Sequence, residues 1–159
     1  AGMGIRYYAY PLAPEFVDRA TEDPWAFMSD DPLADAWGPK ESAPDMLYLD
    51  KCWRYLQRLT TPGVACPRIA YDLFEGDVTH TSRGWIPWIK VLTPDAVSEI
   101  SRDLSLLDGD DVDALLARDD FYTTRLEEDR SYIKEHLRSA QAFTARMQAR
   151  GWGLVYLIG

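Results

Sequence analysis

The C-terminal part of the chain holds the feature that most restricts its fold, a long amphipathic stretch that runs directly into an apolar one. The spacing of apolar residues predicts a helix from Leu126 to Arg150, with acidic residues in its first turn and Gly151 as its C-cap. Trp152 to Ile158 then predicts a mostly apolar strand in the interior of a sheet. A long helix that leads into a closing strand indicates a mixed α/β fold.

Other strands and helices are predicted from apolar alternation, cap residues and prolines. Residues 3–10 alternate as a strand, with Tyr7 on one side and Tyr8 on the other. Residues 85–91 have the pattern of a strand that Pro87 interrupts, which places it at an edge or a bulge. The remaining predictions are a helix from Pro14, a short helix from Pro24 to Phe27 capped by Asp23, an apolar run over 47–49, a helix from Asp50 to Thr61 that Pro62-Gly63 stops, a short helix from Pro67 to Phe74, a polar loop over 77–84, a helix that opens with Thr93 and Pro94, and a helix over 110–117 that Asp108 or Asp110 caps.

The composition of the 159-residue chain, 47% hydrophobic and 27% charged, is typical of one globular domain with a small sheet surrounded by several helices. Ala1-Gly2 ahead of Met3 resembles a cloning remnant, so the domain is expected to cover 3–159. No signal peptide or membrane-length apolar run is visible, which predicts a cytoplasmic protein without a membrane role. Cys52 and Cys66 lack C-x-x-C spacing and are expected to be reduced thiols that fill apolar space.

The formal net charge of −9 argues against binding to nucleic acid, because phosphate backbones select basic surfaces. Arg54, Arg58 and Arg68 are too sparse to form a basic stripe. A basic protein partner fits this charge better.

Residues 21–46 form an acidic stretch that four prolines interrupt. Trp25, Phe27 and Trp37 are unusual for a linker, and long loops in compact domains are often functional. The structural interpretation is that these aromatic residues pin the stretch onto the core. The functional interpretation makes it a contact surface.

Asp50 and Lys51 open a predicted helix, and both a structural and a functional role are open to them. Asp50 can cap the free N–H groups of the helix while Trp53 packs inward. A carboxylate beside a lysine at a helix N-terminus could also bind an anion or tune a proton transfer. Four aromatic residues at strand spacing could line a ligand cleft, although such residues more often belong to the core: Tyr7, Tyr8, Trp85 and Trp88.

Few residues suit catalysis or metal binding, and neither a cofactor nor a catalytic residue is expected. A triad can be sketched from His80, with Cys66 or Ser82 as nucleophile and Asp77 as orienting group, but no nucleophile motif supports it. His136 is expected at the surface of the long helix. Residues 108–113 lack the glycine that a calcium loop needs at its sixth position, so no metal site is predicted.

Several blocks along the chain resemble the YfbM-like family, small bacterial proteins of unknown function. They are Met3-Gly4, Pro14-Glu15, Leu49-Asp50-Lys51-x-Trp53, a short helix ending in Gly76, Leu92-Thr93-Pro94-x-x-Val97 and Arg150-Gly151. The resemblance implies a mixed α/β fold with a small sheet and several helices, and it implies no substrate, cofactor or partner. The family commonly has histidines where this chain has Arg54 and Gln57, which puts in doubt any metal or proton chemistry there.

These observations favour a non-enzymatic binding or regulatory protein of the inhibitor or immunity type. It would engage a basic protein through acidic segments over 21–46, with Asp30, Asp31, Asp35 and Trp37, and over 108–120. The alternative is a small-molecule binder or minor hydrolase with a pocket near Asp50, Lys51, Trp53, Tyr7 and Tyr8. A third option is a scaffold whose partner is another copy of itself.

Overall fold

A computed structural model describes residues 4–62, 66–118 and 120–159. The proposed remnant at residues 1–2, the start of the first strand at Met3 and the helix stop at Gly63 lie outside these residues. The elements along the chain are β1 (Tyr7–Leu12), η1 (Pro14–Phe16), α1 (Val17–Glu22), η2 (Pro24–Phe27), α2 (Pro32–Trp37), η3 (Lys40–Ser42), β2 (Leu47–Asp50), α3 (Trp53–Leu59), η4 (Ile69–Leu73), β3 (Thr79–Thr81), β4 (Gly84–Ile86), β5 (Trp88–Leu92), α4 (Pro94–Leu104), α5 (Gly109–Leu116), α6 (Leu126–Arg150) and β6 (Gly153–Ile158), where η marks a 3-10 helix.

The predicted mixed α/β architecture is confirmed. Over the described residues, a small antiparallel sheet has the strand order β2-β1-β6-β5. β6 is internal, as expected from its apolar sequence: Leu157 pairs with Tyr8 on β1 and with Ile89 on β5. The long helix α6 begins and ends where the sequence predicts, and Gly151 closes it with a left-handed φ of 70°.

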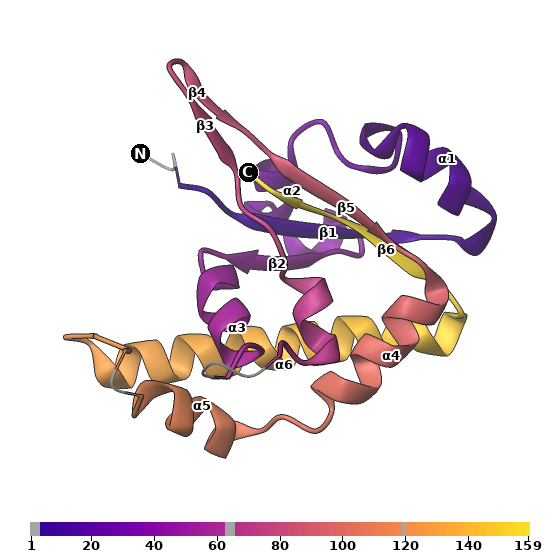
Figure 1. The fold of residues 1–159 in the computed structure, drawn as a ribbon. Helices are drawn as coiled ribbons and strands as arrows, with labels where there is room; N and C mark the ends of the chain where they lie inside the picture. The colour runs from indigo at the N-terminus through magenta and orange to yellow at the C-terminus, as the bar shows by residue number, and fades with distance from the viewer. Residues whose placement is uncertain (1–3, 63–65, 119) are drawn as a thin grey trace.

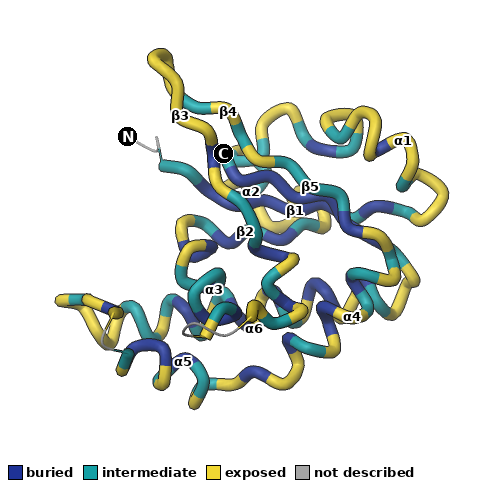
Figure 2. Tube along the Cα trace, viewed as in Figure 1, coloured by how far each residue is buried: buried dark blue, intermediate teal, exposed yellow. Residues whose placement is uncertain are grey.

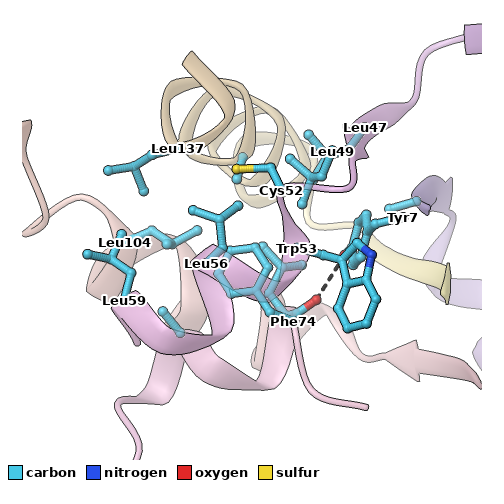
Figure 3. Packing of buried hydrophobic residues seen from close by; sticks show 14 of the residues in the cluster. Tyr7, Leu47, Leu49, Cys52, Trp53, Leu56, Leu59, Phe74, Leu104 and Leu137 are labelled. Atoms are coloured by element: carbon cyan, nitrogen blue, oxygen red, sulfur yellow. Dashed lines mark hydrogen bonds between the residues drawn. The ribbon is translucent and has the colours of Figure 1, made fainter. Parts of the chain in front are cut away.

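Helices α3, α4, α5 and α6 gather on one side of the sheet (Figure 1). We call this the helical side. Its core combines one face of β1 and β6 with the inward residues of the helices, and it includes Tyr7, Trp53, Phe74, Ile133 and Phe143. Figure 3 shows Trp53, Leu56 and Phe74 packed together near the sheet. Cys52 belongs to this core, but Cys66 is exposed, so its predicted role as an apolar filler is wrong.

The other face of the sheet is covered by residues 13–46. Tyr8, Tyr10, Val155 and Leu157 point to this face and pack with Met28, and with Phe27, Leu33 and Ala36 around it. Phe27 therefore pins this segment to the sheet, as the structural interpretation requires. Trp25 and Trp37 bury less of their surface in this packing, because they are 51% and 60% exposed.

Two predicted elements differ from the structure between residues 77 and 92. Pro87 divides the predicted strand into β4 and β5, and β5 is an edge strand as proline led us to expect. The predicted polar loop is wrong in part, because residues 79–81 form β3 and pair with β4. This hairpin projects from the body of the molecule (Figure 1) and is mostly exposed (Figure 2). The two strands are held together by backbone hydrogen bonds and bury little apolar surface, so the sequence shows no apolar alternation that would predict β3.

The structure confirms some of the predicted N-cap side chains and contradicts others. Thr93 caps α4, and Asp108 forms a capping box with Asp111 at α5. Asp23 makes no cap hydrogen bond at η2. Asp50 does not cap α3, whose N-cap is Cys52, and the helix predicted over 67–74 is the 3-10 helix η4.

Candidate functional site

Asp50 ends β2 in an unusual backbone conformation, with φ at +50°, where few residues other than glycine are found. The register between β1 and β2 shifts at Tyr7/Tyr8, which marks a β-bulge beside it. Asp50 does not cap α3, because the N-cap of that helix is Cys52 and the Asp50 carboxylate accepts hydrogen bonds from other segments. Such strained positions are often found at functional sites, so the surroundings of Asp50 are described first.

Three side chains from three segments of the chain donate hydrogen bonds to the Asp50 carboxylate. The Tyr132 hydroxyl on α6 lies 2.7 Å from Oδ2, and the Tyr48 hydroxyl on β2 lies 3.0 Å from Oδ1. Arg6 Nε, just before β1, lies 3.1 Å from Oδ1. The Arg6 side chain is buried, whereas that of Asp50 is 30% exposed. The carboxylate therefore joins the sheet to α6.

The electrostatics of this cluster favour an ionised Asp50. Burial alone would raise the pKa of Asp50, but hydrogen bonds from Tyr132, Tyr48 and Arg6 outweigh it and lower the pKa. Burial raises the pKa of Tyr48 to about 12, and burial together with the hydrogen bond to Asp50 also raises the pKa of Tyr132. A carboxylate with a lowered pKa beside neutral tyrosines is a fixed acceptor and is poorly suited to act as a base.

The structure separates the other residues proposed for an Asp50 pocket. Tyr7 is buried on the helical side, where it stacks on Tyr156 and donates to the Leu73 carbonyl oxygen at 2.9 Å. Trp53 is also buried and donates to the Ile5 carbonyl oxygen at 3.1 Å. Lys51 is exposed, and only its backbone N–H joins the cluster, at 3.2 Å from the Tyr132 hydroxyl. These residues do not line one open site.

Trp37, at the end of α2, lies on the outer side of the Asp50 cluster. Its indole N–H donates to the Tyr48 hydroxyl at 3.1 Å, and the Arg6 guanidinium carbon lies 5.2 Å from its ring centroid. Tyr8 and Tyr48 pack against each other with ring centroids 5.5 Å apart. Trp37 is thus held in place although most of its surface is exposed. The sequence singled out Trp37 and Asp50 but not Arg6, Tyr48 and Tyr132. Arg6 and Tyr132 lie 44 and 82 positions from Asp50, so no local pattern links them, whereas Tyr48 could have been found because it lies two positions before Asp50 on the same face of a strand.

The acidic residues near Trp37 differ in how they are used. Asp31 caps α2 by accepting from the Ala34 N–H at 3.2 Å, and Asp35 accepts from the Tyr10 hydroxyl at 3.3 Å. Asp30 is exposed. Asp45 binds Arg146 and Arg150 of α6, each at 3.0 Å, and fastens the end of the segment.

Residues 13–46 as a whole concentrate the negative charge of the molecule, and we call them the acidic layer. They hold nine acidic and two basic residues, and thus seven of the nine net negative charges. All nine acids except the half-buried Asp35 are exposed: Glu15, Asp18, Glu22, Asp23, Asp30, Asp31, Glu41 and Asp45. The layer therefore presents a strongly negative surface that also carries the exposed Trp25 and Trp37.

The second acidic segment, over 108–120, uses most of its described carboxylates within the molecule. Asp108 and Asp111 form the capping box of α5. Asp113 binds Arg130 and Lys134, and Asp120 binds Arg118 and Arg58. This segment is a weaker candidate for a contact surface than the acidic layer.

The sketched triad finds no geometric support. His80 lies in the exposed hairpin, and the Asp77 carboxylate accepts from Arg54 at 3.2 Å and from the Val78 N–H at 2.8 Å. His136 is half-buried, contrary to expectation, with Nδ1 2.8 Å from the Tyr132 carbonyl oxygen. Among the described residues, no three His, Cys, Asp or Glu side chains are grouped so that they could hold a metal ion.

The chain matches no family model, no curated protein and no solved structure. The resemblance to the YfbM-like family therefore stays a prediction from the sequence. None of the helices in the described part of the chain has the length and apolar character needed to cross a membrane.

Proposed function

We propose that this protein is a non-enzymatic binding protein of the inhibitor or immunity type, which engages a basic protein through its acidic layer. The observation that carries the proposal is that the acidic layer, which covers one face of the sheet, concentrates seven net negative charges and two exposed tryptophans. A cytoplasmic location and a place in the YfbM-like family belong to the same proposal, because both rest on the sequence.

The two kinds of side chain would act at different stages of association. Exposed carboxylates of one sign attract a basic surface over several ångströms and accelerate encounter, an effect that salt screens. Tryptophan is enriched among the residues that dominate interface energies. Trp37 is already fixed by Tyr48 and Arg6, so little of its conformational freedom remains to be lost on binding.

The observations do not favour a pocket at Asp50, Lys51 and Trp53. Trp53 and Tyr7 are buried, and three donors already engage the Asp50 carboxylate. The third option, self-association, has no observation in its favour.

The test is the association rate constant with a basic protein partner, captured on the immobilised protein and then purified. We expect the triple variant E22Q/D23N/D30N to associate about tenfold more slowly at low salt, because three exposed charges are lost from the acidic layer. Trp37→Ala should instead mainly increase the dissociation rate constant.

A matched control removes three exposed acids from the helical side, in the variant D72N/E99Q/E135Q. Its net charge equals that of the first variant, so its association rate constant should stay near that of the unaltered protein. Equal slowing of both variants, or no slowing of either, would contradict an acidic-layer interface.

A further inference from the structure

A pocket of about 360 Å³ opens on the helical side, between α3, the segment before η4, and α5. Its apolar lining consists of Leu59, Pro62, Leu107, Ala114 and Leu115. The three leucines are buried and form a fixed floor, whereas Ala114 is exposed and lies at the rim. The size is within the range of small-molecule sites.

Three arginines also line this pocket, Arg58, Arg68 and Arg118. They meet in one pocket although acidic residues outnumber basic ones in the chain, 26 to 17. The arginines come from three separate segments, so only the tertiary structure brings them together. Asp111 is the one acid in the lining, and its carboxylate is engaged by the Asp108 N–H at 2.9 Å.

The three guanidinium groups are held in place by contacts within the protein. Arg68 makes two hydrogen bonds to Asp103, at 3.3 and 2.8 Å. Arg118 donates to the Arg58 carbonyl oxygen at 3.1 Å, and Arg58 stacks on Phe121 with 4.9 Å between its guanidinium carbon and the ring centroid. These bonds engage only part of the five N–H donors on each guanidinium. A prepositioned donor loses little freedom when it binds a ligand.

Asp120 shows how this rim receives a carboxylate. Arg118 donates to both of its oxygens, at 3.1 and 3.0 Å, and Arg58 lies 3.1 Å from Oδ1. The Asp120 side chain is nevertheless 60% exposed. Water therefore reaches this ion pair, and both guanidinium groups keep N–H donors that Asp120 does not use, so an external carboxylate can compete with Asp120 for Arg58 and Arg118.

We propose that this pocket binds a small carboxylate with an apolar body, a class that includes short- and medium-chain fatty acids. The apolar body would lie on Leu59, Leu107 and Leu115, and the carboxylate would be received by Arg58 and Arg118, whose planar donors match its geometry. The pocket lies across the sheet from the acidic layer, so this inference does not depend on the proposed function.

The experiment is a titration of the isotope-labelled protein, followed through its backbone amide NMR signals. The probes are hexanoate, 1-hexanol, which has the body without the charge, and acetate, which has the charge with almost no body. We expect hexanoate to shift signals of α3 and α5, with a Kd about tenfold or more below the Kd of either control compound.

Three variants make the test specific to this pocket. Ala114→Phe should fill the pocket and weaken hexanoate binding about tenfold or more, whereas Ala117→Phe, at the exposed end of the same helix and outside the lining, should bind as the unaltered protein does. Asp120→Asn should tighten binding about twofold to fivefold, because it removes the competing carboxylate.

Equal affinity for 1-hexanol and hexanoate would overturn the role of the arginines. Unchanged binding to the Ala114→Phe variant, or signal shifts confined to other parts of the molecule, would overturn the pocket as the site. Weaker binding to the Asp120→Asn variant would show that Asp120 orients the arginines and does not compete with the ligand.

Discussion

At the scale of single residues, Asp50 shows how position in the chain and role in the structure can diverge. Its place before α3 is that of a cap, yet its carboxylate receives Arg6, Tyr48 and Tyr132 instead. Asp50 adopts this role with a positive φ of +50°, a conformation that residues other than glycine rarely take. A residue that a local pattern assigns to a helix thus joins the sheet to α6.

Replacement of Asp50 by asparagine should destabilise the protein by about 1–3 kcal/mol at pH 7, because the buried Arg6 then lacks its carboxylate. Because the pKa of Asp50 is lowered in the folded protein, the stability difference between the two proteins depends on pH. The carboxyl group of Asp50 binds its proton more tightly in the unfolded chain than in the folded protein. The stability that the ionised carboxylate contributes is therefore present above about pH 4 and is lost as the pH falls through the folded-state pKa.

Urea unfolding of both proteins between pH 7 and pH 3 measures this difference. Asp30→Asn, at an exposed position, is the control and should leave the stability within about 0.5 kcal/mol of the unaltered protein. A stability loss in Asp50→Asn that stays constant down to the lowest pH would show that its carboxylate charge is irrelevant.

At the scale of elements, the turn after η4 is fitted closely to β5. Gly76 has φ at +119°, and a β-carbon there would come within 2.4 Å of the Trp88 ring. The Gln57 side chain holds the same turn, through hydrogen bonds to the Phe74 and Gly76 carbonyl oxygens at 2.6 and 2.8 Å. The turn therefore links α3 to the edge strand.

Gly76→Ala should destabilise the protein by roughly 2–4 kcal/mol, the sum of backbone strain and the clash with Trp88. Gly84→Ala is the matched control, because Gly84 also has a positive φ, +140°, but has open space around it. It should cost only the backbone part, about 1–2 kcal/mol. If both variants lose the same stability in thermal or urea unfolding, the Trp88 side chain moves aside and the clash contributes nothing.

At the scale of the whole molecule, the sheet separates two different layers, one on each of its faces. The helical side holds the larger core, while the acidic layer covers the other face with a smaller cluster. The two cysteines can be used to probe the packing of the helical side, because Cys52 is buried in its core and Cys66 is exposed. Burial also raises the pKa of the Cys52 thiol well above its ordinary value.

A thiol-reactive chromogenic disulfide should therefore modify one cysteine rapidly in the folded protein and the second only as the protein unfolds. The Cys66→Ser variant should lose the rapid phase, and the Cys52→Ser variant should keep it. Rapid modification of both thiols under native conditions would contradict the packing of Cys52 between β2, α3 and α6.

The sequence alone determined the boundaries of α6, the cap of α4 and the internal position of β6, and it narrowed the cap of α5 to Asp108 or Asp110. Prolines, caps and apolar periodicity act over a few residues, so their consequences are visible in the chain itself. The Asp50 cluster and the arginine pocket were decided only by the tertiary structure. Asp50 meets partners 44 and 82 positions away, and Arg58 meets a residue 62 positions away. Such contacts depend on how the layers pack, and no local pattern encodes them.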